Sequence, residues 1–119
     1  MPYGDACFRY FTTLKRWADA EAHCQDVGGH LASIEDNDEN YAVIANIVEP
    51  GLTWIGLNDQ NVEGLFQWVD GSVFSYEGWA DNEPGMTGND HDCVTISPTG
   101  KWYDVLCVLY YTYVCQITL

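Results

Sequence analysis

Apolar residues in the first part of the chain recur at helical spacing. In the sequence LKRWADAEAHCQDV, residues 14–27, one helical stripe carries Leu14, Trp17, Ala18, Ala20 and Cys24, and two glycines follow at positions 28 and 29. A second stretch, residues 35–50, opens with acidic residues that suit a helix N-terminus, continues with apolar residues at helical spacing and ends at Pro50. We therefore expect helices over residues 14–27 and 35–50.

The pattern changes from Thr53 onward to short runs rich in β-branched and aromatic residues, separated by Gly, Asp, Asn and Pro. These runs predict strands at residues 53–57, 65–69, 92–96, 101–105 and 111–117. Two helices followed by strands favour an α+β fold. A chain of 119 residues has room for one domain, which we place at residues 1–119.

A stretch of more than twenty residues, from Asp70 to Asp92, shows little regular pattern. A loop of this length is uncommon in a compact domain unless it is functional. Its last part, DNEPGMTGNDHD, residues 81–92, gathers carboxylates around one proline and one histidine. We therefore expect the functional site in this long loop.

The chain is strongly acidic, with 4 basic residues against 18 acidic ones and a formal net charge of −14. Such a charge repels phosphate backbones and anionic membranes, so nucleic acid is excluded as a partner. The simplest role of the acidic surface is to keep the protein soluble.

Five cysteines, with no CxxC pair and no zinc spacing, are typical of a disulfide framework made in an oxidising compartment. No apolar run has the length of a membrane span, and the first five residues lack the pattern of a signal peptide. We expect a secreted, extracellular protein in its mature form, without membrane insertion.

An ordered set of motifs resembles the C-type lectin-like domain family over nearly the whole chain. The motifs are WADAEAHCQDVGGHLASI from Trp17, WIGL at 54–57, EP at 83–84, DCV at 92–94, Trp102, and the cysteines at 107 and 115. The resemblance implies a double-loop α+β fold with two helices and two small antiparallel sheets. It also implies two disulfides, Cys24–Cys115 and Cys93–Cys107. Trp17, Trp68, Trp102 and the WIGL run are expected to fill the core.

The fifth cysteine, Cys7, precedes an aromatic residue. In longer members of the family, the cysteine at this position pairs with one about a dozen residues upstream, and this chain starts too late to supply that partner. We therefore expect Cys7 to form an inter-chain disulfide in a covalent dimer, with a buried thiol as the alternative.

The resemblance also indicates where sugar-binding relatives hold calcium through oxygen ligands. Glu83 and Asp104 match these positions, whereas Gly85, His91 and Tyr103 stand where acids or amides are expected. Because calcium needs six to eight oxygens, we expect a degenerate site. Neighbours that could replace a lost ligand are Asp81, Asn89 and Asp90.

A second, structural calcium position resembles the family better, since Asp59, Glu63 and Asp92 match and only Met86 and His91 do not. For Asp59 and Glu63, a solvated loop pair is an equally good interpretation. Calcium is therefore not expected to be required, and no other cofactor is expected.

Without calcium, the same loop still offers chemistry for a sugar, because aromatic faces pack on pyranose C–H groups and short polar side chains hold hydroxyls. We expect a calcium-independent carbohydrate site with Glu83, Asp90, His91, Asp92, Tyr103 and Asp104. An acetamido group adds a methyl, an N–H and a carbonyl, so N-acetylated hexosamines are the expected ligands, with GlcNAc and GalNAc both open. Trp79 is expected to pin the loop.

An enzyme is not indicated, because His23, His30 and His91 lie beside no recognisable nucleophile. The rival hypothesis is a protein–protein interaction module of the same fold that binds no sugar.

Overall fold

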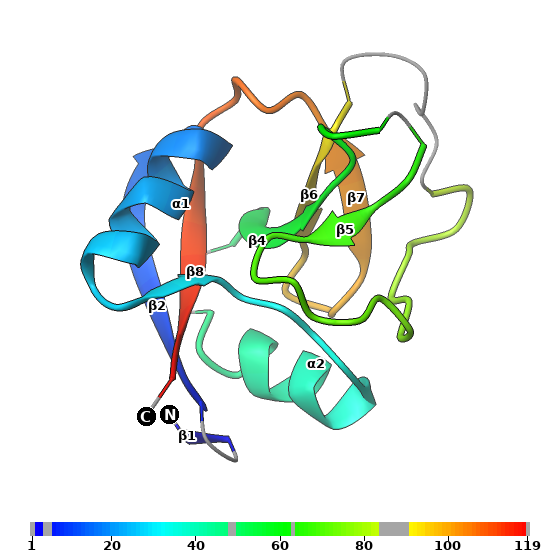
Figure 1. Cartoon of the computed structure of the whole chain (residues 1–119). Helices are drawn as coiled ribbons and strands as arrows, with labels where there is room; N and C mark the ends of the chain where they lie inside the picture. The colour runs from blue at the N-terminus through cyan, green and yellow to red at the C-terminus, as the bar shows by residue number, and fades with distance from the viewer. Residues whose placement is uncertain (1, 4–5, 48–49, 63, 84–90, 119) are drawn as a thin grey trace.

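The computed structural model describes residues 2–3, 6–47, 50–62, 64–83 and 91–118. Figure 1 shows two helices arranged around a sheet, with the two ends of the chain close together. The helices are α1 (Trp17–Asp26) and α2 (Asn37–Ile44). The strands are β1 (Pro2–Tyr3), β2 (Ala6–Lys15), β3 (Gly29–Leu31), β4 (Thr53–Asn58), β5 (Gln67–Trp68), β6 (Cys93–Ile96), β7 (Trp102–Val105) and β8 (Tyr111–Thr118).

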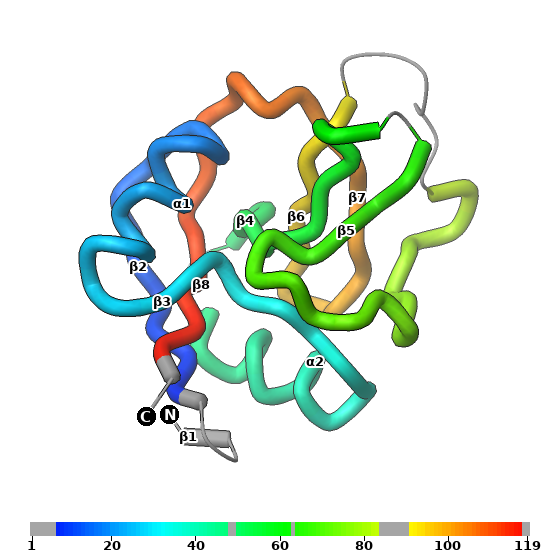
Figure 2. The backbone as a smooth tube through the Cα atoms, viewed as in Figure 1, coloured from blue at the N-terminus to red at the C-terminus, as the bar shows by residue number. Residues whose placement is uncertain are grey.

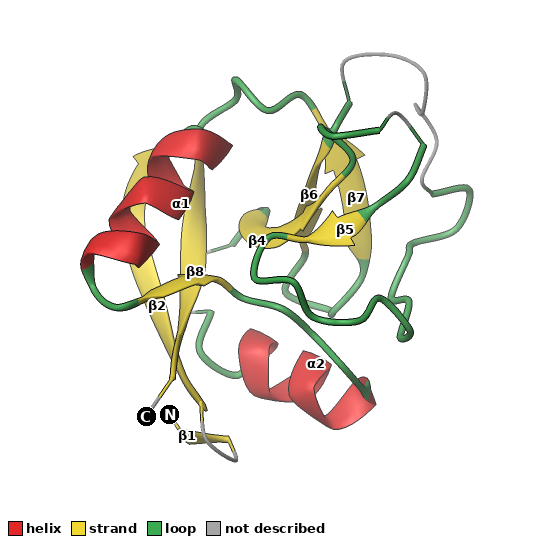
Figure 3. Cartoon of the chain, viewed as in Figure 1, coloured by secondary structure: helices red, strands yellow, loops and turns green. Residues whose placement is uncertain are grey.

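The strands form one mixed sheet in the order β1-β2-β8-β4-β6-β7, with β3 added on β8 and β5 added on β4 (Figure 3). A short parallel pair, β4 with β8, joins the two antiparallel parts, and the buried hydroxyls of Thr53 and Thr112 lie 2.8 Å apart across it. The α+β class is confirmed. The two separate antiparallel sheets that we expected are instead connected through this pair.

Two apolar cores lie on opposite faces of the sheet because successive strand residues point to opposite sides. On β8, Tyr113 and Cys115 pack with α1, whereas Val114 belongs to the core that includes Val43 of α2. β4 contributes to both cores, so all six of its residues are buried. This explains why the WIGL run is continuously apolar, and it confirms that the run is part of the core.

Helix α1 begins later than the apolar stripe predicts. Leu14 belongs to β2 instead, and its side chain is exposed. The other stripe residues Trp17, Ala20 and Cys24 are buried as expected, whereas Ala18 is exposed. The stripe therefore identified the helix but placed its start in the preceding strand.

Helix α2 lies within the predicted range and is shorter than predicted. Its N-cap is Asp36, whose Oδ1 accepts the N–H of Glu39 at 2.8 Å. The carboxylate of Glu39 reaches back to the N–H of Glu35 at 2.6 Å, so two backbone donors at the start of the helix are satisfied. The expected acidic start is thus confirmed, but the helix ends at Ile44 rather than near Pro50.

Both expected disulfides are present, Cys24–Cys115 between α1 and β8 and Cys93–Cys107 at the base of the long loop. Cys7 lies on β2 opposite Ile117 of β8 and is half-buried. Its inter-chain disulfide stays a prediction. In the described part of the chain, neither helix is long and apolar enough to cross a membrane.

Candidate functional site

The long loop leaves the sheet after β5, turns back along β7 and returns to the sheet at β6 (Figure 2). Two backbone hydrogen bonds attach it to Trp102 of β7. The N–H of Trp102 donates to the oxygen of Gly78 at 2.9 Å, and the N–H of Ala80 donates to the oxygen of Trp102 at 3.0 Å. The loop segment 78–80 is therefore added beside β7 almost as a further strand.

Aromatic rings fix this loop on the buried indole of Trp102. The ring centroids of Tyr76 and Trp79 each lie 5.7 Å from that of Trp102, and Trp79 also packs on Phe66 at 5.1 Å. The expectation that Trp79 pins the loop is confirmed. Tyr76 has the same role.

A tight turn carries Glu83. The N–H of Glu83 donates to the oxygen of Ala80 at 3.0 Å, and Asn82 has a φ of 66°, a left-handed conformation that asparagine tolerates. Because Ala80 is bonded to Trp102, this turn places Glu83 close to the start of β7. The Glu83 side chain is half-buried.

His91 is tied to β7 at the other end of the long loop. Its Nδ1 lies 3.3 Å from the backbone oxygen of Asp104. A carbonyl oxygen can only accept, so Nδ1 must carry the proton in this contact, and Nε2 of the neutral ring remains an acceptor. The His91 side chain is half-buried.

Tyr103 and Asp104 are consecutive residues of β7, so their side chains point to opposite faces of the strand. Tyr103 is half-buried, whereas Asp104 is only 3% exposed and lies on the same face as the buried Trp102. Both residues were expected to bind sugar. The burial of Asp104 leaves Tyr103 as the accessible polar side chain of this strand.

At the second expected calcium position, one carboxylate oxygen of Asp59 is used in a bond within the protein. The N–H of Asp59 donates to the oxygen of Asp92 at 2.9 Å, and Oδ2 of Asp59 accepts the N–H of Gly64 at 2.8 Å. Asp59 is 1% exposed, and Asp92 is half-buried. One carboxylate oxygen of Asp59 therefore holds the turn that follows β4.

The described residues do not make a calcium cage. Among them, no group of three or more acidic, histidine or cysteine side chains could hold a metal ion. The expectations for Glu63, Gly85, Met86, Asn89 and Asp90 lie outside the described residues. We therefore assign no step of binding to calcium.

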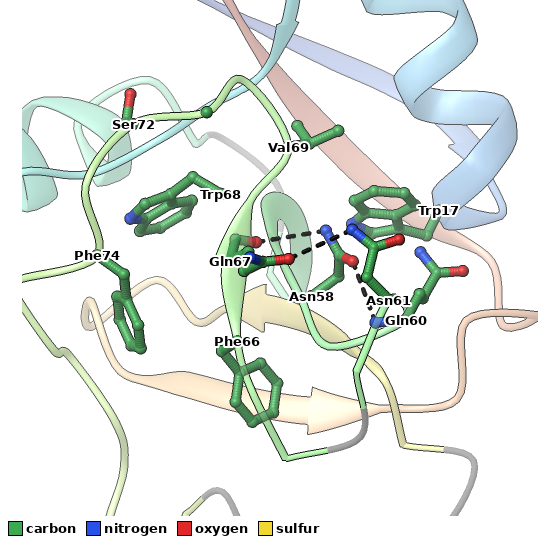
Figure 4. A pocket seen from close by; sticks show the side chains of 11 residues that line it. Trp17, Asn58, Gln60, Asn61, Phe66, Gln67, Trp68, Val69, Ser72 and Phe74 are labelled. Atoms are coloured by element: carbon green, nitrogen blue, oxygen red, sulfur yellow. Dashed lines mark hydrogen bonds between the residues drawn. The ribbon is translucent and has the colours of Figure 1, made fainter.

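A cavity of about 710 Å³ lies along β5, and the sequence reasoning missed it. Four amide side chains line it, those of Asn58, Gln60, Asn61 and Gln67 (Figure 4). β5 and β7 are at opposite ends of the local strand order β5-β4-β6-β7, so the cavity is separate from Tyr103. The clustering of amides at positions 58–67 was the signal that could have revealed it.

The model of the lectin C-type domain family matches residues 13–117 of the chain. An alpha-N-acetylgalactosamine-specific lectin of Patiria pectinifera is 38% identical to it, over 98% of this chain and 76% of that protein. The versican core protein of Bos taurus is 40% identical over 92% of this chain, but the chain spans only 3% of versican.

Solved structures agree with this similarity. A calcium-independent type II antifreeze protein superimposes with a TM-score of 0.91 and 28% identity, covering 99% of this chain and 90% of that one. The family model, the relatives and the observed fold with its two disulfides all point to one family. The chain belongs to the C-type lectin domain family.

Proposed function

We propose that this protein is a secreted lectin that binds N-acetylated hexosamines without calcium, at a site formed by the accessible side chains of Glu83, His91 and Tyr103. The observation that carries this proposal is the bond from His91 Nδ1 to the oxygen of Asp104. It holds an imidazole acceptor beside β7, where relatives that use calcium would need an acid. We also assign the half-buried Asp92 to the site. Asp90 is assigned to it from the sequence alone.

An acetamido group fits the chemistry of these side chains. Its N–H can donate to Nε2 of His91, and its methyl can pack on the ring of Tyr103. Carboxylates such as Glu83 accept sugar hydroxyls, but plain hexoses and N-acetylated hexosamines both carry these hydroxyls. The acetamido group therefore supplies the selectivity, and plain hexoses should bind weakly.

The similarity to an N-acetylgalactosamine-specific lectin supports the N-acetylated class. The sequence left both N-acetylglucosamine and N-acetylgalactosamine open, and this similarity makes N-acetylgalactosamine the first sugar to test. Independence from calcium is supported by the residues themselves, because His91 and Tyr103 replace acid or amide oxygens with an imidazole and a phenol.

The two disulfides support a site of action outside the cell, because disulfides persist in oxidising compartments. We further propose that Cys7 links two copies into a dimer, which would present two sugar sites and strengthen binding to a surface with many glycans. Non-reducing electrophoresis tests the dimer. Migration as a monomer would contradict it.

Competitive elution from immobilised N-acetylgalactosamine tests the sugar site. We expect N-acetylgalactosamine or N-acetylglucosamine to elute the protein, and galactose or glucose to elute it poorly. His91→Ala and Tyr103→Ala should lose retention, whereas Tyr41→Ala, an exposed tyrosine on α2, should not. Equal elution by the parent sugars would refute the acetamido hypothesis, and normal retention of both site variants would place the pocket elsewhere.

The alternative is an interaction module of the same fold that binds another protein and no sugar. Absence of retention on every sugar would favour it. Catalysis is not part of either proposal. His23 contacts the hydroxyl of Tyr113 at 2.5 Å, and His30 contacts the carboxylate of Glu21 at 2.6 Å, so both histidines take part in packing of α1.

A further inference from the structure

A cavity outside the proposed site lies along β5, and we call it the amide pocket. Its volume of about 710 Å³ falls within the roughly 300–1,000 Å³ typical of pockets for drug-sized ligands. In Figure 4, Asn58, Gln60, Asn61 and Trp17 lie on one side of β5, and Trp68 and Phe74 lie on the other. The residues that line the pocket therefore lie on both sides of β5.

The amide pocket is uncharged in a strongly acidic protein. None of the described residues that line it is an acid or a base, although the chain has 18 acidic residues and a net charge of −14. A cation would be drawn to the acidic surface elsewhere, and an anion would be repelled by it. A neutral, polar ligand fits this lining best.

The amide side chains are held in place and still offer hydrogen-bonding groups. Oδ1 of Asn58 accepts the N–H of Gln60 at 3.2 Å, and Nδ2 of Asn61 donates to Oε1 of Gln67 at 3.3 Å. In the second pair, Nε2 of Gln67 remains available as a donor and Oδ1 of Asn61 as an acceptor. Both side chains are exposed. A donor and an acceptor side by side match a hydroxyl group, which can both donate and accept.

Aromatic side chains line the pocket on both sides of β5, with Trp17 beside the amides and Trp68 and Phe74 across the strand. Phe74 is half-buried and packs edge-on against Trp68, with centroids 6.3 Å apart. Nε1 of Trp68 is buried and has no hydrogen-bond partner among the described residues. Aromatic walls with neutral donors and acceptors match a pyranose ring, which has apolar C–H faces and hydroxyl edges.

We propose that the amide pocket is a second, calcium-free subsite that binds an uncharged sugar unit of an oligosaccharide. The inference rests on the proposed sugar-binding function but not on its site. With strands about 4.8 Å apart, three strand spacings place β5 roughly 14 Å from β7. One sugar unit cannot occupy both sites, so an oligosaccharide should bind more tightly than its terminal monosaccharide.

Isothermal titration of the whole chain with N-acetylglucosamine and with triacetylchitotriose, a neutral trisaccharide, tests this subsite. We expect Asn61→Ala and Gln67→Ala each to weaken trisaccharide binding about five-fold, the effect of one lost hydrogen bond, and to leave monosaccharide binding unchanged. The matched control is Asn46→Ala. The Asn46 side-chain amide forms a hydrogen bond at the end of α2 and does not line the pocket. Near-ultraviolet circular dichroism checks that the variants are folded.

Side-chain amide signals in nitrogen-15 NMR locate the ligand directly. The subsite would be supported if the trisaccharide shifts the Asn61 and Gln67 signals and does so in His91→Ala as well. This result would hold even if the site at His91 bound no sugar. If those signals stay still while the His91 signals move, the subsite is refuted and the proposed function stands. If no signal moves with either sugar, both are refuted. Shifts caused by a neutral peptide but not by the trisaccharide would also overturn the proposal.

Discussion

The indole Nε1 of Trp102 donates a hydrogen bond of 3.0 Å to Oδ1 of Asn40, which connects β7 to α2 through the core. The same amide uses Nδ2 to donate to the backbone oxygen of Gly100 at 2.9 Å. Both bonds are buried, and Trp102 is the residue on which the long loop is packed. Asn40 therefore supports the loop without touching it.

Removing this amide should destabilise the protein strongly. In Asn40→Ala, Nε1 of Trp102 and the oxygen of Gly100 lose their partners, at a cost of about 1–3 kcal/mol for each buried group. Urea unfolding followed by tryptophan fluorescence measures the loss. The control is Asn37→Ala on the same helix, whose exposed bond to the Tyr76 hydroxyl should contribute less than about 1 kcal/mol. Equal losses in the two variants would contradict the role given to Asn40.

Gly78 should not tolerate even one methyl group. A Cβ at this position would lie 2.7 Å from Cε2 of the Trp102 indole, which is fixed by its bond to Asn40. We expect Gly78→Ala to cost about 1–3 kcal/mol, as overpacking of a core does. It should also weaken sugar binding, because the loop segment that leads to Glu83 must shift. Ser75→Ala, an exposed change in the same loop, is the control, and wild-type stability of Gly78→Ala would show that the loop can move away.

Glu39 should make stability depend on pH. Burial raises the pKa of this carboxyl above its ordinary value of 4.5, and the charges of Glu35, Asp36 and Asp70 raise it further, against the lowering effect of the Glu35 N–H. The folded protein then holds the proton more tightly than the unfolded chain. The stability due to Glu39 is present below pH 4.5 and is lost as the pH rises through the folded-state pKa.

The variant Glu39→Gln keeps an acceptor for the Glu35 N–H and removes the charge. We expect it to melt at a higher temperature than wild type at about pH 7, with the difference shrinking toward about pH 4, where Glu39 is largely protonated. Asp26→Asn, a change of an exposed carboxylate at the end of α1, controls for net charge. A melting difference that grows as the pH falls would have the wrong sign for this explanation.

The sequence predicted elements well where local pattern and burial agree. The apolar stripe of α1 and the acidic start of α2 are such cases. Strand β2 was missed, because it is held by pairing with β8 about a hundred residues later and its register shifts between Phe11 and Lys15. Exposed Leu14 then continued the apolar stripe by chance, which moved the predicted helix start into the strand.

The sequence predicted the anchoring of the long loop on β7, whereas a sugar site at Glu83, His91 and Tyr103 stays a prediction. The burial of Asp104 could have been predicted, because Trp102 was expected in the core and residues two apart on a strand share a face. The cluster of amides at positions 58–67 was a signal for the amide pocket, but its shape depends on the pairing of Asn58 with Gln67 across β4 and β5.

Sugar binding should persist when calcium is removed. Calcium normally needs six to eight oxygens. Two of the three replaced positions offer an imidazole, which suits a hard cation poorly, and a phenol in place of an acid or amide. We expect the same retention on immobilised N-acetylgalactosamine with calcium and with an excess of chelator. Glu83→Gln should reduce retention equally in both conditions, because its carboxylate would act on the sugar directly. Asp59→Asn tests the second calcium position separately. Calcium bound there should affect the melting temperature rather than retention. Calorimetry that finds submicromolar calcium binding, abolished by Glu83→Gln but not by Asp59→Asn, would show instead that the long loop completes a cage around the ion.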